Sequence, residues 1–385
     1  MLRRCTVTSF HKDANTYIQT RDEDQYFFVH HELVSAISPA LAEKMQERVL
    51  HVTCGDRHQR GYRQVVKMVD ENDDPVGLSI LFQLIHWKFH ELSDRLSVDQ
   101  LFAVARVVDK YDCVFMISPY AERWLINGLH WHIAMNKSAN EYDKILVLAW
   151  IFGDGRAFAK ALPKVVSSCT LDSEGVLIDY NGKPWKNQPI PIELIDIIKD
   201  ARYIRARKMV ATFNEPCRVL LDGSEKLKYC RSGDATAEIK EQCLHLQLGS
   251  LMSGLNAVGM MPFPMEDKYL GSFGEMVKKL ETVKVARYKL PGTLPHTDSH
   301  INCGFKHREA IKAVKQEPVY LTRSLFATLR RHGEESMAYR KESFAEVKVK
   351  HSNRKDDIPE CVTQMPEDST LFIEKWVEEV EFEEE

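Results

Sequence analysis

Cysteine and histidine residues gather in two segments, "YCRSGDATAEIKEQCLHLQLGSLMSGLNAVGMMPFP" and "LPHTDSHINCGFKH". Thiolate and imidazole are the ligands that suit zinc, and four of them in a closed tetrahedral set would stabilise a segment whose own core is small. His300 and Cys303 have the two-residue gap of a chelating pair, whereas twelve residues separate Cys230 from Cys243. The candidate ligands are Cys230, Cys243, His296, His300, Cys303 and His307, with Cys217 upstream. The alternative interpretation is a helical domain with buried thiols and surface histidines.

The composition is that of an ordinary globular protein. The chain has 385 residues, 44% hydrophobic and 28% charged, which predicts two or three domains. Its formal net charge of −4 gives no general attraction for nucleic acid or acidic membranes. The longest apolar run, over residues 145–152, is far shorter than the roughly 20 residues that cross a bilayer, and no signal peptide is recognisable. We therefore expect an intracellular protein, in nucleus or cytoplasm, with mostly reduced cysteines.

Helix and strand signals are dense in the first third of the chain. Residues 16–29 predict two extended segments around an acidic turn, and Ser38-Pro39 predicts a restarted helix. Ser97 with Gln100 predicts a capping box, and Ser118 followed by Pro119 predicts a further helix start. Asp74-Pro75 predicts a helix whose apolar face consists of Leu78, Leu81, Phe82, Ile85 and Phe89.

These blocks carry a family resemblance. "YFFVHHELVSAISPALAEKM", "DDPVGLSILFQLIHWKFHELSDRLSVDQLFAVARVVDKYDC" and "ISPYAERWL" occur in an order that resembles a BTB/POZ domain of the divergent type found in filamentous fungi. The resemblance covers residues 14–128 and implies an α+β domain of short strands with a cluster of helices, in which Trp124 closes the core. It further implies a docking platform whose apolar face pairs with a second copy or with another protein, such as a cullin-type scaffold.

The remainder predicts mainly helices. We expect a helical region over residues 129–215, a helical Cys/His-containing region over 216–315 and a charged, partly disordered tail over 316–385. A helix over about residues 191–212 is expected to bury Ile195, Ile198 and Ile204 and to expose Arg202, Arg205, Arg207 and Lys208.

The Cys/His region has a resemblance of its own. "CLHLQLGSLMSGLNAVGMMPFP", "YLGSF" and a following His-x-x-Cys are similar to the C-terminal region of the same fungal BTB proteins. The resemblance favours Cys230, Cys243, His300 and Cys303 as one set of metal ligands, for a single structural zinc ion.

Several common catalytic motifs are missing from the sequence. It contains no HExxH, no Gly-rich phosphate loop and no G-x-S-x-G elbow, and His130 and His132 would point about 200° apart on a helix. Cys113 lies in a helix-connecting segment that the BTB resemblance explains as packing. We therefore expect a non-enzymatic protein-protein interaction protein with no membrane partner. Its interactions would include those of an adaptor for a cullin-type ubiquitin ligase. The alternative is a transcription-related protein whose zinc-stabilised region contacts nucleic acid, for which the basic residues near His307 are few.

Overall fold

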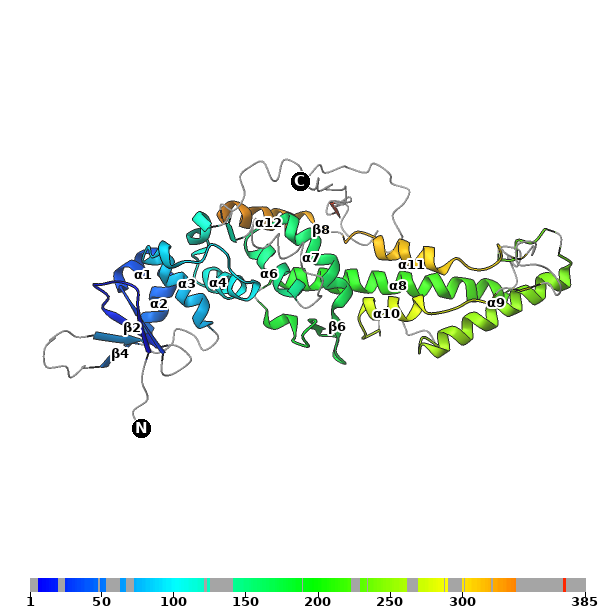
Figure 1. Cartoon of the computed structure of the whole chain (residues 1–385), viewed down its shortest axis with the longest axis horizontal. Helices are drawn as coiled ribbons and strands as arrows, with labels where there is room; N and C mark the ends of the chain where they lie inside the picture. Colours follow the sequence, from blue (N-terminus) through cyan, green and yellow to red (C-terminus); the bar gives the residue numbers. More distant parts are fainter. Residues whose placement is uncertain are drawn as a thin grey trace, which may run out of the picture. The chain divides into compact units, whose positions relative to one another are not determined.

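The computed structural model is mixed α+β, with short strands and mostly helices (Figure 1), as expected from the sequence. It describes residues 6–19, 25–47, 49–52, 63–66, 73–120, 123–124, 141–188, 190–222, 229–233, 235–261, 269–286, 288–289, 300, 302–319, 321–336 and 370–371. The chain divides into two compact units. The first unit comprises residues 1–162 and 322–370, and the second comprises residues 163–321 and 371–385.

A five-stranded sheet opens the first unit. The strands are β1 (Thr6–Ser9), β2 (Thr16–Gln19), β3 (Gln25–Val29), β4 (Val49–Val52) and β5 (Arg63–Val66), in the order β1-β3-β2-β5-β4. β2 and β3 form an antiparallel pair, as do β4 and β5, while β1 runs parallel to β3 and β2 parallel to β5. Ile18, Phe27 and Val29 are buried, because alternate residues of a strand point to the same face. The two extended segments over residues 16–29 are confirmed.

Two helices lie between β3 and β4 and two more follow β5, and side chains cap the latter two as expected. These helices are α1 (His31–Ile37), α2 (Pro39–Glu47), α3 (Pro75–Ile85) and α4 (Val98–Lys110). Asp74 accepts hydrogen bonds from the amides of Val76 and Gly77, at 2.8 and 3.4 Å. Ser97 and Gln100 form the predicted capping box. These caps satisfy amides that a helix start leaves without partners.

Two expectations about this region were wrong. Ser118 does not mark a helix start, because it lies within a 3-10 helix, η2 (Val114–Tyr120), while most of the helix expected after it lies outside the described residues. Phe89 does not continue the buried face of α3: the helix ends at Ile85, Trp87 takes a left-handed φ of 57°, and Phe89 enters the 3-10 helix η1 (Phe89–Glu91) half exposed. The left-handed residue redirects the chain, so that the helical period no longer applies beyond it.

Trp124 lies in the core, as expected. Its indole is fully buried, donates from Nε1 to the backbone oxygen of Ser93 at 2.9 Å, and stacks on the ring of Tyr120. Buried tryptophan normally finds such a partner for its N–H group.

A helix from much later in the sequence belongs to the first unit. α12 (Arg323–Glu335) contacts α6 (Tyr142–Ile151), beside which it lies in Figure 1. His332 Nδ1 lies 2.9 Å from the backbone oxygen of Trp150, and Ser336 donates to that of Phe152 at 3.0 Å. Gly153 has a φ of 67°, and a Cβ atom there would lie 2.0 Å from the amide nitrogen of Gly333. The turn after α6 therefore approaches α12 backbone to backbone.

The second unit is built around one long helix, α8 (Ile192–Asp222), which contacts α9 (Ala237–Ala257), α10 (Phe273–Glu281) and α11 (His307–Gln316). A buried apolar cluster that includes Met209, Phe213, Leu255 and Met276 fills the space between them. The other elements here and at the unit boundaries are α7 (Gly155–Ser168), β6 (Thr170–Leu171), β7 (Leu177–Ile178), η5 (Trp185–Asn187), β8 (Leu321–Thr322) and β9 (Thr370–Leu371). Within the part of the chain that is described, no helix has both the length and the apolar character needed to span a membrane.

The basic residues of α8 are only partly exposed, in contrast to the expectation. Arg207 faces solvent, but Arg202 and Arg205 are buried. Arg202 donates to the backbone oxygens of Tyr269, at 2.5 Å, and Gly271; Arg205 donates to that of Glu317 at 2.6 Å. Lys208 forms an ion pair with the Glu317 carboxylate. These side chains tie the loops before α10 and after α11 to the central helix.

Candidate metal centre

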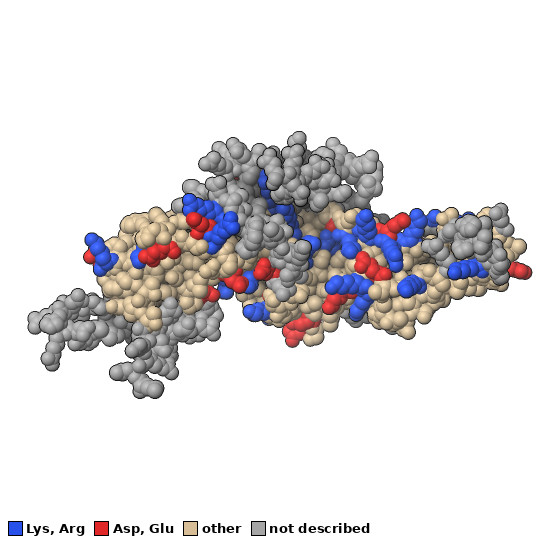
Figure 2. Space-filling model, viewed as in Figure 1, with Lys and Arg blue, Asp and Glu red and all other residues tan. Residues whose placement is uncertain are grey.

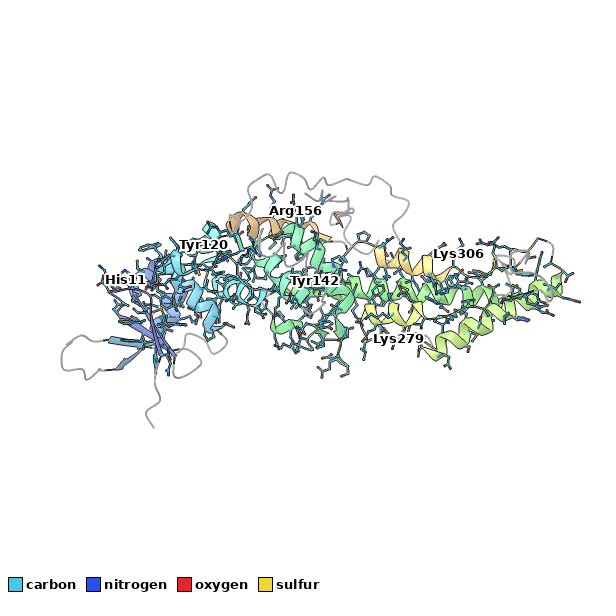
Figure 3. The ribbon with its side chains drawn as sticks, in the orientation of Figure 1. His11, Tyr120, Tyr142, Arg156, Lys279 and Lys306 are labelled. Carbon is cyan, nitrogen blue, oxygen red and sulfur yellow. The ribbon has the colours of Figure 1, made fainter. Side chains whose placement is uncertain are left out.

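Three separate stretches of the second unit supply a cluster of cysteine and histidine side chains. Cys230 lies in residues 229–233, between α8 and α9, and Cys243 lies in the first half of α9. His300 and Cys303 come shortly before α11, whose N-terminal neighbour Lys306 is labelled in Figure 3. The cluster therefore joins segments that are up to 73 residues apart in the sequence.

The ligand atoms of the four residues form a tight group. One donor atom from each of Cys230, Cys243, His300 and Cys303 lies within 4.8 Å of all the others, and all four residues are buried. His300 Nδ1 is 3.7 Å from the Cys230 sulfur and 3.5 Å from the Cys303 sulfur. The Cys230 and Cys303 sulfurs are 3.9 Å apart. This buried cluster can hold a metal ion.

Neighbouring N–H groups point at two of the three sulfurs. The Arg231 amide donates to Cys303 Sγ at 3.2 Å, and the Gln247 side-chain amide donates to Cys243 Sγ at 3.2 Å. Gln247 also reaches the backbone oxygen of Tyr229, at 3.3 Å, which fixes its orientation. Such donors stabilise thiolates and orient metal ligands.

Burial makes the Cys243 and Cys303 thiols harder to deprotonate. Burial first, and then the neighbouring Cys230 and Cys303 thiols, raise the pKa of Cys243 to about 12, against the lowering effect of Gln247. Burial likewise raises the pKa of Cys303, while the Arg231 amide opposes the increase. A metal ion that binds here must therefore displace protons from the sulfurs.

Among the residues that the structure describes, the apolar core around the cluster is small. Its buried members are Val219, Tyr229, Cys230, Cys243, Leu244 and Cys303, with Leu248, Tyr288 and Phe305 packed against them. Three of the six buried members are thus the cysteines themselves. The described residues around the cluster therefore offer little hydrophobic surface that could hold the first half of α9 to the segments around Cys230 and Cys303.

The structure brings together four of the seven candidate ligands. Cys217 is buried in the larger apolar cluster between α8 and α10, and His307 lies against the rings of Phe213 and Phe305. His296 lies outside the described residues, as do His130 and His132. Sequence reasoning missed Gln247, which is one helical turn after Cys243 on α9. A polar residue four positions from a candidate ligand was the available signal.

Cys113, the other cysteine considered for chemistry, is a buried packing residue. It has no exposed surface, and burial raises the pKa of its thiol to about 12. The reactive form of cysteine is the thiolate, and burial disfavours that form here.

Comparisons with protein-family models, with curated proteins and with solved structures found no match to this chain. The BTB/POZ resemblance therefore stays a prediction from the residues of the first unit. The ligand geometry of the cluster does not depend on that resemblance.

Proposed function

We propose that this chain is a non-enzymatic interaction protein, in which the first unit docks other proteins as a BTB/POZ domain and the second unit is stabilised by a structural zinc ion. The partner of the first unit would be a second copy of the domain or a cullin-type scaffold, in which case the chain acts as an adaptor.

The observation that carries the docking proposal is that the blocks of the resemblance meet in one core. Phe27 and Val34 from the first block and Leu81 and Leu101 from the second are buried, and α3 contacts α1, α4 and η2, in which the third block begins. The order of strands and helices also supports the proposal: a hairpin, two short helices, a second strand pair in the same sheet, and the α3–α4 pair.

Exposed aromatic side chains offer contact points on this unit. Trp87 is 58% exposed and Phe89 44%, and the 3-10 helix η1 follows immediately after the left-handed Trp87. Tryptophan and phenylalanine are enriched at the energetic centres of protein interfaces. A strained backbone at an exposed tryptophan is typical of a functional position.

Mixed surface charge gives no support to the nucleic-acid alternative. On the face drawn in Figure 2, basic and acidic side chains are interspersed. Arg218 pairs with Glu215, Lys306 with Glu309, and Lys315 with Glu281, so these basic residues of the second unit have acidic partners. Binding to phosphate backbones needs a concentrated positive surface.

The docking proposal is tested with purified full-length chain. Light scattering measures self-association, and pull-down with a purified cullin-type scaffold measures the second mode. The double variant Trp87→Asn, Phe89→Ser removes both aromatic side chains, and asparagine tolerates the left-handed backbone. We expect it to lose at least tenfold in affinity, whereas the control Ile192→Ser, at a 70% exposed position of the second unit, binds normally. Absence of both binding modes in the wild-type chain would refute the proposal.

The ligand set and its spacing support zinc as the ion. A tetrahedral zinc with Zn–S of about 2.3 Å and Zn–N of about 2.0 Å requires neighbouring sulfurs about 3.8 Å apart and sulfur about 3.5 Å from nitrogen. The corresponding distances here are 3.9 Å between Cys230 and Cys303, and 3.5 and 3.7 Å to His300 Nδ1. Four protein ligands leave no open position for substrate, which is the pattern of a structural site.

Metal analysis tests this second part. We expect inductively coupled plasma mass spectrometry to find about one zinc ion per chain in the wild-type protein and none in Cys303→Ala. The matched control is Cys217→Ala, which removes another buried sulfur of the same unit, outside the cluster. Folded wild-type protein that contains no zinc after purification in zinc-supplemented buffer would contradict the proposal.

A further inference from the structure

Two of the three cysteines in the metal cluster, Cys230 and Cys303, lie on non-helical segments and have sulfurs close enough to be joined by a small movement. The Cys230 and Cys303 sulfurs are 3.9 Å apart, so a disulfide of about 2.04 Å requires them to approach by about 1.9 Å. Each of these residues is 3% exposed, whereas Cys243 has no exposed surface. Of the three cysteine residues of the cluster, Cys230 and Cys303 thus keep a small exposed fraction and Cys243 keeps none.

The backbone around this pair can make the movement. Cys230 and Cys303 lie on non-helical segments that run beside each other, with the Gly304 amide donating to the Tyr229 oxygen at 3.1 Å. Gly304 has a φ of 120°, and a Cβ atom there would have no neighbour within 4 Å, so there is space around the backbone next to Cys303. Cys243, in contrast, is fixed within α9 and hydrogen bonded to Gln247.

We propose that the cluster is a redox modification site: a hydroperoxide joins Cys230 to Cys303 as a disulfide and releases the zinc, leaving Cys243 as a free thiol. The inference rests on the proposed zinc site and adds a regulated state to it.

The chemistry balances with the hydroperoxide as the oxidant. One zinc-bound thiolate attacks the terminal peroxide oxygen, the O–O bond breaks, and a sulfenic acid forms while the departing alkoxide takes a proton. The second thiolate then attacks the sulfenic sulfur, forms the S–S bond and expels hydroxide, which a second proton converts to water. Two thiolates are thus oxidised by two electrons, and the hydroperoxide is reduced to alcohol and water. Zinc loses two of its four ligands.

The zinc-bound state and the disulfide state differ in which segments of the second unit they link. Zinc links the Cys230 segment, the Cys303 segment and α9 at one point, whereas the disulfide links only the first two. Because the apolar core at this place is small, we expect the first half of α9 to open when Cys243 is no longer held. Oxidation would thereby change the surface that residues 237–247 present.

The test uses full-length, reduced, zinc-loaded protein treated with tert-butyl hydroperoxide. Zinc release is followed with a chromogenic chelator, and disulfides are mapped by mass spectrometry of non-reduced peptides. We expect one zinc released for each Cys230–Cys303 disulfide, faster hydrogen exchange over residues 237–247, and recovery of all three signals with dithiothreitol and zinc. Cys217→Ala should behave like the wild-type chain.

The outcomes separate this inference from the zinc proposal. Reduced protein that never binds zinc refutes the zinc site, while disulfide mapping of the same sample still tests the pairing. Zinc-loaded protein that keeps its metal and its thiols under a tenfold excess of hydroperoxide refutes the redox inference alone. A dominant disulfide to Cys243, or oxidation to sulfinic acid without a disulfide, also overturns it.

Discussion

Replacing Gly77 by alanine should weaken the contact between α3 and α4, although alanine is the better helix former. Gly77 lies in the first turn of α3, and a Cβ atom there would be 2.4 Å from the backbone oxygen of Ala103 and 2.7 Å from its carbonyl carbon. Real Cβ atoms essentially never lie closer than 3.0 Å to such neighbouring heavy atoms. The two helices must therefore move apart, since the atoms in the way belong to the backbone of α4.

The magnitude follows from two opposing effects. Alanine gains about 1 kcal/mol over glycine within a helix. Overpacking of a tight core typically costs about 1–3 kcal/mol, and the upper end applies here because backbone atoms cannot rotate away. We expect a net loss of about 2 kcal/mol in the unfolding free energy of the first unit. Gly249→Ala in α9 is the matched control: no atom lies within 4 Å of its Cβ position, so it should stabilise by about 0.5–1 kcal/mol.

Hydrogen exchange in increasing urea measures the effect in each unit separately, through peptides of α3 and α4 for Gly77→Ala and of α9 for Gly249→Ala. The assay avoids a single two-state fit, which a chain of two units does not justify. If Gly77→Ala is as stable as the wild-type chain, the close approach of α3 and α4 described above is wrong. Equal destabilisation by both substitutions would show that the gain in helix propensity from glycine to alanine was overestimated, and would not support a specific effect of the contact between residue 77 and Ala103.

Three further perturbations test the first unit. Trp124→Ala should cost about 3–5 kcal/mol, measured by hydrogen exchange in urea over peptides of the first unit, whereas Trp87→Asn, at an exposed position, should cost less than about 1 kcal/mol; equal effects would contradict the core placement. Burial lowers the pKa of His86 from its ordinary 6.5 to about 4, so the folded protein favours the neutral imidazole. The contribution of His86 to stability is therefore complete above pH 6.5 and is lost as the pH falls towards 4. His86→Gln should reduce that pH dependence in denaturation experiments, and an unchanged profile would exclude His86 as its source. Gly153→Ala should release α12, seen as faster exchange over residues 323–335, whereas Gly182→Ala, also at positive φ but with open space, should leave α12 protected.

The sequence predicted two helix caps and the grouping of four cysteine and histidine residues. Asp74 and Ser97 cap their helices as expected, because capping depends only on residues within one turn. Cys230, Cys243, His300 and Cys303 come together as the sequence suggested. Few other side chains have the chemistry for such a set, and the resemblance to fungal BTB proteins selected four among the seven candidates.

Features that depend on tertiary neighbours were not predicted. β1 and β4 are four-residue strands without a clear alternating pattern, and their pairing with β3 and β5 makes them strands. Arg202 looked like a solvent-exposed basic residue, yet the carbonyl groups that satisfy it come from residues 269 and 271. No pattern within α8 indicates that these distant acceptors exist.

The return of α12 to the first unit has a consequence for folding during synthesis. The first unit needs residues 322–336, but residues 163–321 must leave the ribosome before them. At roughly 5–20 residues per second, the first 162 residues wait about 10–30 seconds for their last helix. Throughout that interval the surfaces of Trp150 and Gly153 that α12 covers stay open. A chaperone, or a binding partner that recognises this surface, would be able to bind it on the nascent chain.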